Sequence, residues 1–77
     1  MPTIRIRVLR DGKPARGHRV VLSYSGLAGG MSNAEYTDSN GIAEFDADYG
    51  QEGEVYVDGS EEGHWGSYSA RDVTVYL

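Results

Sequence analysis

The stretch YTDSNGIAEF, Tyr36–Phe45, contains the local signal that decides the fold. It places Asp38, Asn40 and Gly41 between two alternating segments, so it is either part of a calcium loop or a tight turn joining two strands. An EF-hand loop needs another carboxylate two residues before Asp38, where this chain has Tyr36, and helices on both sides. Asn-Gly is a strong hairpin signal, because both residues tolerate positive φ. We therefore predict a hairpin turn at Asp38, Asn40 and Gly41, with backbone N–H groups bonded to Asp38 and no metal.

Alternating segments elsewhere in the chain predict an all-β fold. No window has apolar residues at helical spacing free of glycine, and glycine makes up 11 of the 77 residues. We predict an antiparallel β-sandwich of six or seven short strands, formed as a single domain over residues 1–77. The expected strands are at residues 4–8, 18–24, 34–37, 42–47, 54–59 and 71–77, and the expected loops at 12–17, 25–33 and 59–67.

The apolar positions on one side of these strands form the predicted core. A chain of 77 residues buries only about 60% of its unfolded surface, and without cysteine it has no disulfide to compensate. The predicted core residues are Ile4, Ile6, Val8, Val20, Leu22, Phe45, Val55, Val57, Val73 and Val75.

Charge is distributed unevenly along the chain, whose net charge is −5. Six of the seven basic residues precede Val20, and eleven of the twelve acidic residues follow Arg19. The acidic majority repels phosphate, so nucleic acid is not an expected partner. Two explanations of the asymmetry stay open: basic strands paired with acidic ones, or a basic side that docks onto an acidic partner or a second copy.

The turn residues also carry a family resemblance. The segments DGKPARGHRVVLSY, YTDSNGIAEF and GEVYVDG resemble the carboxypeptidase regulatory-like and transthyretin-like (prealbumin-like) modules. Bacterial Ig-like and collagen-adhesin B-type modules share much of this pattern. The resemblance implies a prealbumin-like or Ig-like sandwich that acts as a spacer, accessory domain or adhesion unit, usually in a larger extracellular chain. The residues that match are Asp11, Gly12, Pro14, Gly17, Val20, Leu22, Thr37, Asp38, Gly41 and Phe45.

No pattern in the sequence indicates catalysis, and no cofactor is expected. Hydroxyisourate hydrolases resemble transthyretin but end in Tyr-Arg-Gly-Ser, whereas this chain ends DVTVYL. Intradiol dioxygenases, on a related sandwich, bind iron with two tyrosines and two histidines, but the spacing of His18, His64 and the tyrosines does not support such a site. A Ser-His-Asp site lacks its G-x-S-x-G turn.

The segment Ser60–Ser69, predicted as a loop, contains the candidate binding residues His64, Trp65 and Tyr68. Aromatic groups on a loop can stack on a sugar ring or anchor a protein partner. Alternatively, Trp65 folds back to close one end of a small core. A divalent cation held by Glu61, Glu62 and His64 is a weaker alternative.

We therefore expect a non-catalytic structural or protein-interaction module that acts through a sheet face, an edge strand or the segment Ser60–Ser69. The alternative is a small carbohydrate- or ligand-binding module. Tyr36, Tyr56 and Tyr76 are candidates for a tyrosine-rich face, and the last strand is the candidate edge. The chain starts with no secretory signal and has no apolar segment long enough for membrane insertion, so an extracellular location is expected only within a longer protein.

Overall fold

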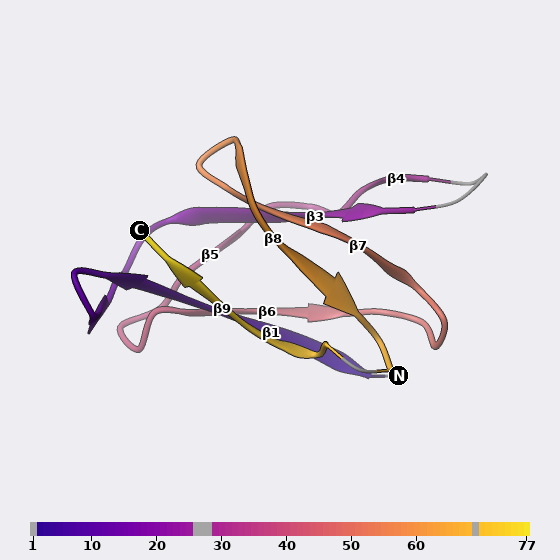
Figure 1. Ribbon diagram of the computed structural model, residues 1–77, viewed down its shortest axis with the longest axis horizontal. Helices are drawn as coiled ribbons and strands as arrows, with labels where there is room; N and C mark the ends of the chain where they lie inside the picture. The colour runs from indigo at the N-terminus through magenta and orange to yellow at the C-terminus, as the bar shows by residue number, and fades with distance from the viewer. Residues whose placement is uncertain (1, 26–28, 69) are drawn as a thin grey trace.

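A computed structural model describes residues 2–25, 29–68 and 70–77, which form an all-β structure of two sheets, consistent with a sandwich. Strands account for the regular structure of these residues, and none of them is helical. The described residues therefore contain no helix that is long and apolar enough to cross a membrane. Figure 1 shows one sheet lying over the other, with β8 and β9 on the near side.

Sheet A is built around β1 (Thr3–Arg10). This strand pairs antiparallel with β2 (Lys13–Pro14) and β6 (Ile42–Asp46), and parallel with β9 (Asp72–Tyr76). The parallel pair departs from the prediction of a wholly antiparallel fold. It arises because the chain enters β9 beside the start of β1, where the Arg5 N–H donates to the Arg71 carbonyl (2.6 Å), so both strands run in the same direction.

Sheet B is built around β3 (Arg19–Tyr24). One side of β3 pairs with β7 (Glu52–Val57), which pairs in turn with β8 (Ser60–Gly66). β4 (Gly30–Met31) and β5 (Glu35–Tyr36) also pair with β3. Among the described residues β9 has β1 as its one strand partner, so the last strand lies at a sheet edge as predicted.

The core lies between the two sheets. Nine of the ten predicted core residues are buried, and the tenth, Val73, is partly buried against the others. Further side chains that were not among the predicted core residues complete the cluster. These are Ala15, Ala43, Ala47 and Trp65, with Tyr24 packed against them.

Two Asp-Gly pairs form two-residue hairpin turns. Asp11 and Gly12 have φ values of 52° and 78°, and Asp58 and Gly59 have values of 53° and 86°. Positive φ at both central residues is the signature of the type I′ turn, whose twist matches that of the flanking strands. The first turn adds β2 to β1, and the second adds β8 to β7.

These hairpins correct two of the predicted loops. Residues 12–17 contain β2, and most of residues 59–67 form β8, a strand of seven residues. The loop prediction for residues 59–67 was wrong because β8 does not alternate between polar and apolar residues. Its glycines and acidic residues are instead typical of a loop. A bulge between Val55 and Tyr56 also shifts its register. The predicted loop 25–33 contains the short β4, while residues 26–28 lie outside the described residues.

A turn forms at Asp38 with the predicted Asp38 contacts, but the prediction that it closes a hairpin is wrong. Gly41 donates its N–H to the Asp38 carbonyl (2.9 Å), and the Asp38 carboxylate accepts N–H bonds from Asn40 (2.8 Å) and Ile42 (3.0 Å). Within the turn only Gly41 has positive φ, 75°. The flanking strands β5 and β6 belong to different sheets, so the turn connects the two sheets at a corner.

Candidate functional site

Trp65 lies in the core and not on the surface. Its side chain is fully buried, and the indole Nε1–H donates a hydrogen bond to the Ser23 carbonyl (2.9 Å). The ring also packs edge-to-face on Tyr24, with centroids 5.7 Å apart. Of the two alternatives for this residue, the structure therefore supports the one in which it folds back into the sandwich, and the indole offers no face to a ligand.

His64 and Tyr68 lie apart from each other. His64 projects from the outer side of β8, with Nδ1 3.6 Å from Glu54 Oε2. Tyr68 follows β8 and stacks on Tyr49, with ring centroids 5.9 Å apart, and both rings are more than half exposed. The structure therefore does not gather His64, Trp65 and Tyr68 into one aromatic site. Within the described ranges no three His, Asp or Glu side chains converge as a metal site either.

The predicted tyrosine-rich face is also divided between the sheets. Tyr36 and Tyr56 lie on sheet B and point away from the core, whereas Tyr76 is exposed on sheet A beside Leu9.

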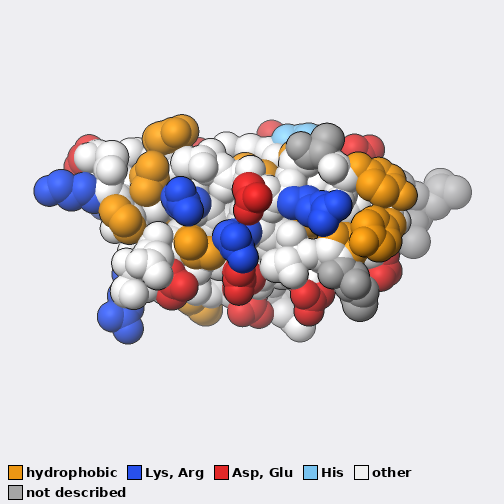
Figure 2. Space-filling view, turned by 90° about the horizontal axis from the view of Figure 1, so that it is seen from below, with side chains coloured by type: hydrophobic (Ala, Val, Ile, Leu, Met, Phe, Trp, Pro, Cys, Tyr) orange, Lys and Arg blue, Asp and Glu red, His pale blue; other side chains and the backbone are white. Residues whose placement is uncertain are grey.

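One contact in sheet A agrees with the pairing of basic strands with acidic ones. Arg5 Nε on β1 donates a hydrogen bond to Glu44 Oε2 on β6 (3.0 Å). Figure 2 shows basic and acidic side chains interspersed over the outer face of sheet A.

The outer face of sheet B is the candidate site, and it starts from three consecutive apolar residues in β3. Val20 and Leu22 point into the core, so alternation directs Val21 outward. Val21 is nevertheless only 4% exposed and lies outside the core cluster. Other side chains on the outer face of sheet B therefore cover Val21.

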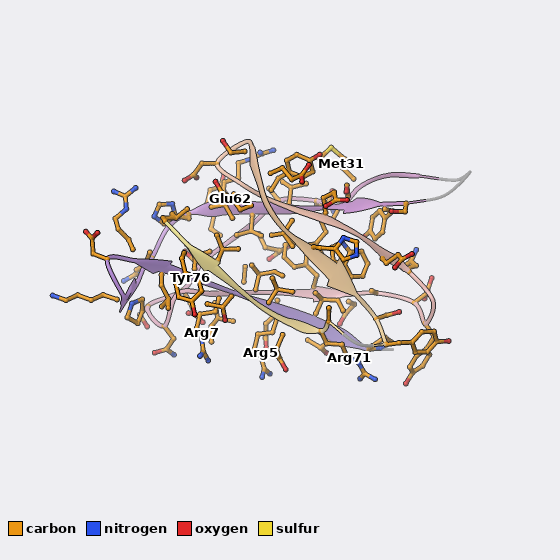
Figure 3. The ribbon with its side chains drawn as sticks, viewed as in Figure 1. Arg5, Arg7, Met31, Glu62, Arg71 and Tyr76 are labelled. Atoms are coloured by element: carbon orange, nitrogen blue, oxygen red, sulfur yellow. The ribbon has the colours of Figure 1, made fainter. Side chains whose placement is uncertain are left out.

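A groove with a volume of about 370 Å³ lies over Val21. Tyr56, directly opposite Val21 on β7, lines one side, and Met31 of β4 lines the other. Met31 is 58% exposed, and Figure 3 shows it on the outside of sheet B, away from the core. The remaining lining residues are Arg19, Ser32 and Gly59.

A pair of side chains holds one end of this groove. His18 Nδ1 lies 2.6 Å from Asp58 Oδ2, and Asp58 Oδ1 accepts the backbone N–H of Arg19 (3.2 Å). The hydrogen bond to His18 lowers the pKa of the Asp58 carboxyl, assisted by the Arg19 N–H and opposed by desolvation. The pair ties the start of β3 to the β7–β8 turn, so it fixes Arg19 and Gly59 at the groove's end.

The His18–Asp58 pair has the orientation used in Ser-His-Asp sites, but its third member is missing. Among the described residues no serine or threonine hydroxyl hydrogen-bonds the His18 ring; Thr37 Oγ1 accepts the His18 backbone N–H instead. The nucleophile–base contact that acyl transfer needs is therefore not formed by the residues described.

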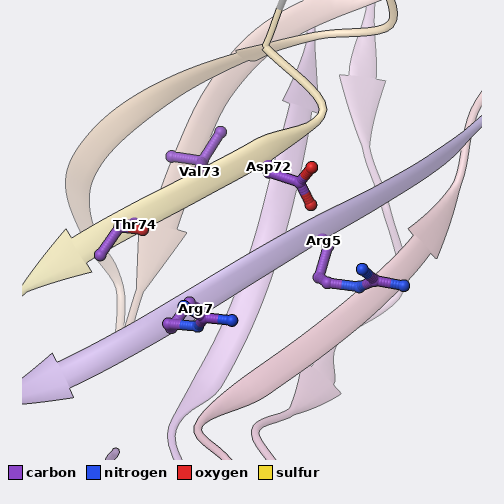
Figure 4. Close-up of a pocket in the computed structure, with 5 residues that line it drawn as sticks. All are labelled: Arg5, Arg7, Asp72, Val73 and Thr74. Carbon is purple, nitrogen blue, oxygen red and sulfur yellow. The ribbon is translucent and has the colours of Figure 1, made fainter. Parts of the chain in front are cut away.

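Two other grooves are less apolar. One, of about 330 Å³, lies beside β1 and β9 and is lined by Arg5, Arg7, Asp72, Val73 and Thr74 (Figure 4). The other, of about 280 Å³, lies by β6 and is lined by Glu35, Glu44, Asp46 and four further residues. Three of the five residues lining the first groove and three of the seven lining the second are charged, and neither groove lies on the outer face of sheet B with Val21.

The sequence held one signal for the groove that pattern analysis missed. Val20-Val21-Leu22 interrupts the polar–apolar alternation expected of a strand with one wet face. Met31, on the far side of the groove, lies in a segment predicted as loop.

No protein-family model matches the chain, and neither the curated proteins nor the solved structures include one that is significantly similar to it.

Proposed function

We propose that this protein is a non-catalytic interaction module that binds a protein partner through the outer face of sheet B. The observation that carries the proposal is Val21, an outward-facing apolar residue at the base of a groove between Met31 and Tyr56. Protein interfaces are enriched in methionine and tyrosine at the centre, with polar residues around them. This face has that composition, with Arg19 and Ser32 beside the apolar residues.

Crosslinking from position 31 tests the proposal. A photoreactive amino acid is placed at Met31, and a matched one at Thr74, which is exposed on the outer face of sheet A. In cells that make the protein, we expect a discrete protein adduct from position 31, lost in a Tyr56→Ala background, and none from position 74. Equal adducts from both positions, or none from position 31, would contradict the proposal.

We also propose a transthyretin-like or Ig-like sandwich as the finer description of the fold. Support comes from the residues of the resemblance, which occupy structural positions: Asp11-Gly12 forms a hairpin turn, and Thr37 and Phe45 are buried. Gly41 donates to Asp38 and accepts from Val8 at the corner between the sheets. An experimental structure with a strand order unlike that of those modules would refute this assignment.

Carbohydrate binding is a second candidate, favoured by the stacked pair of Tyr49 and Tyr68. Both residues are more than 60% exposed, and exposed aromatic rings can stack on a sugar ring. A titration with a panel of oligosaccharides followed by NMR tests it, with Tyr68→Ala as the variant. Shifts confined to these two residues and lost in Tyr68→Ala would favour this candidate; no shift with any sugar would remove it.

A further inference from the structure

We infer that the partner segment bound by sheet B is a positively charged stretch of polypeptide that carries at least one apolar side chain. This inference rests on the interaction proposed above and adds the chemistry of the partner. It follows from the floor of the groove, from the charges around it and from their placement on the sheet.

The floor of the groove requires an apolar contact. Val21 lies between Met31 and Tyr56 in a groove of about 370 Å³, and Met31 is largely exposed. An apolar side chain placed there would remove the exposed methionine and the half-buried tyrosine from water together. Because burial of apolar area is the main favourable term in protein association, this position suits the anchor of a partner.

The charged residues on the side of Tyr56 that faces away from Val21 are acidic. Glu61 lies opposite Tyr56 in the β7–β8 ladder, and Glu54 and Glu52 share its side of the sheet because they alternate with buried residues of β7. Glu54 is half-buried and has only the long contact to His64, at 3.6 Å, as an ion pair with a described residue. Across this part of the face the field is negative, as it is for the chain as a whole, whose net charge is −5.

The one arginine or lysine that the described strands place on this face is Arg19, at the other end of the groove. Its backbone is held by the Asp58 carboxylate. The face therefore has one cation, near Gly59 and beside the Asp58 carboxylate, and further acidic residues over β7 and β8. A partner whose apolar side chain rests on Val21 would place its lysines or arginines over Glu54 and Glu61.

Complementary charge of this kind selects the partner and speeds its association more than it adds affinity. It also selects against other classes of ligand, because phosphate groups and acidic peptides would meet the carboxylates of β7 and β8. A second copy of the chain is the remaining occupant, since its Arg10, Lys13 and Arg16 are exposed near the β1–β2 turn.

The experiment uses three synthetic peptides of equal length with the same central leucine, flanked by lysine, by glutamine or by glutamate. Each is titrated into the full ¹⁵N-labelled chain, and the amide shifts and dissociation constant are measured by NMR. We expect the lysine peptide to bind tightest, to shift Val21, Met31 and Tyr56, and to weaken as salt is raised. In the variant Glu54→Gln/Glu61→Gln the affinity for the lysine peptide should fall about two- to thirtyfold, the range for two partly exposed ion pairs.

The matched control is Asp46→Asn/Asp72→Asn, which removes two carboxylates from the exposed residues of sheet A and should leave the affinity unchanged. Equal binding of the glutamine peptide at the same amides would refute the charge inference and leave the proposed interaction face intact. If no peptide shifts these amides, the inference and the proposed face both fail. Concentration-dependent shifts of the same amides without peptide would identify a second copy as the occupant and overturn the inference.

Discussion

The indole Nε1–H of Trp65, on β8, donates a 2.9 Å hydrogen bond to the backbone carbonyl of Ser23, on β3. The strand β7 lies between β3 and β8, and its residue at this position is Gly53. Gly53 lies opposite Trp65 in the ladder, and a Cβ at this position would overlap the Ser23 carbonyl oxygen. Because Gly53 has no side chain, the indole of Trp65 can lie across β7 and donate its hydrogen bond to Ser23 on β3.

Gly53→Ala is expected to destabilise the protein by about 2–4 kcal/mol, because it adds an atom where backbone already lies and disrupts the Trp65–Ser23 hydrogen bond. The free energy of unfolding in urea measures the effect. The matched control is Gly66→Ala in β8, where a Cβ would meet only the Glu52 Cβ at an ordinary 3.7 Å. A Gly53→Ala variant no less stable than Gly66→Ala would contradict the close approach.

Fluorescence reports the burial of Trp65 directly, because it is the only tryptophan in the chain. We expect a blue-shifted emission that acrylamide and iodide quench weakly, since the side chain is fully buried. In urea the emission should shift to the red in a single transition together with the circular dichroism. Emission like that of free tryptophan in the native protein would place the indole at the surface and return Trp65 to the candidate binding residues.

Gly41 is expected to be the least replaceable of the turn residues with positive φ. A Cβ there would lie 2.6 Å from the Val8 carbonyl oxygen and 3.0 Å from the Ala15 nitrogen, both backbone atoms. Gly50 has a similar φ, 88° against 75°, with nothing within 4 Å of its Cβ position. Gly50→Ala should therefore cost about 1 kcal/mol for backbone strain alone, and Gly41→Ala about 1–3 kcal/mol more for the overlap. Equal thermal shifts in the two variants would argue against the packed corner between the sheets.

The pH dependence of stability should report the Asp58–His18 contact. The hydrogen bond from His18 lowers the pKa of Asp58 in the folded state, so the folded protein keeps this carboxylate ionised below the pH at which the unfolded chain protonates it. The contribution of the Asp58–His18 contact to the free energy of unfolding is therefore present above about pH 4. It is lost as the pH falls through the pKa of Asp58 in the folded protein. Solvent screening of the half-exposed carboxylate limits the contribution to under about 1 kcal/mol.

Urea unfolding of the wild type and Asp58→Asn between pH 2 and pH 6 measures this contribution. Asparagine tolerates the positive φ of position 58, so the substitution removes the charge without straining the turn. The difference in unfolding free energy should be largest at the upper end of the range and shrink toward the lower end. A difference that grows on acidification would show that the contact does not stabilise the ionised carboxylate.

The strand content and most of the core were predictable, because both depend on local pattern. Ile4, Ile6 and Val8 alternate with arginines, and burial of one side of such a strand follows from the pleat alone. The contacts of Asp38 were predictable for the same reason, since its carboxylate bonds to amides two and four residues away. For the candidate site only the interrupted alternation at Val21 was visible, because Met31 and Tyr56, which line the groove with it, belong to other strands.

By itself, the sequence determined which residues can turn, which alternate, and that an acidic chain without cysteine must rely on a small apolar core. Only the tertiary structure decided that the Asp-Gly pairs form hairpins and the Asn-Gly turn joins two sheets. It likewise decided that β9 runs parallel to β1, that Trp65 reaches Ser23, and that Val21 lies under Met31 and Tyr56. The physical reason is the range of the interactions. Backbone preferences and alternation act over a few residues, whereas strand pairing and the path of a large side chain depend on segments distant in sequence.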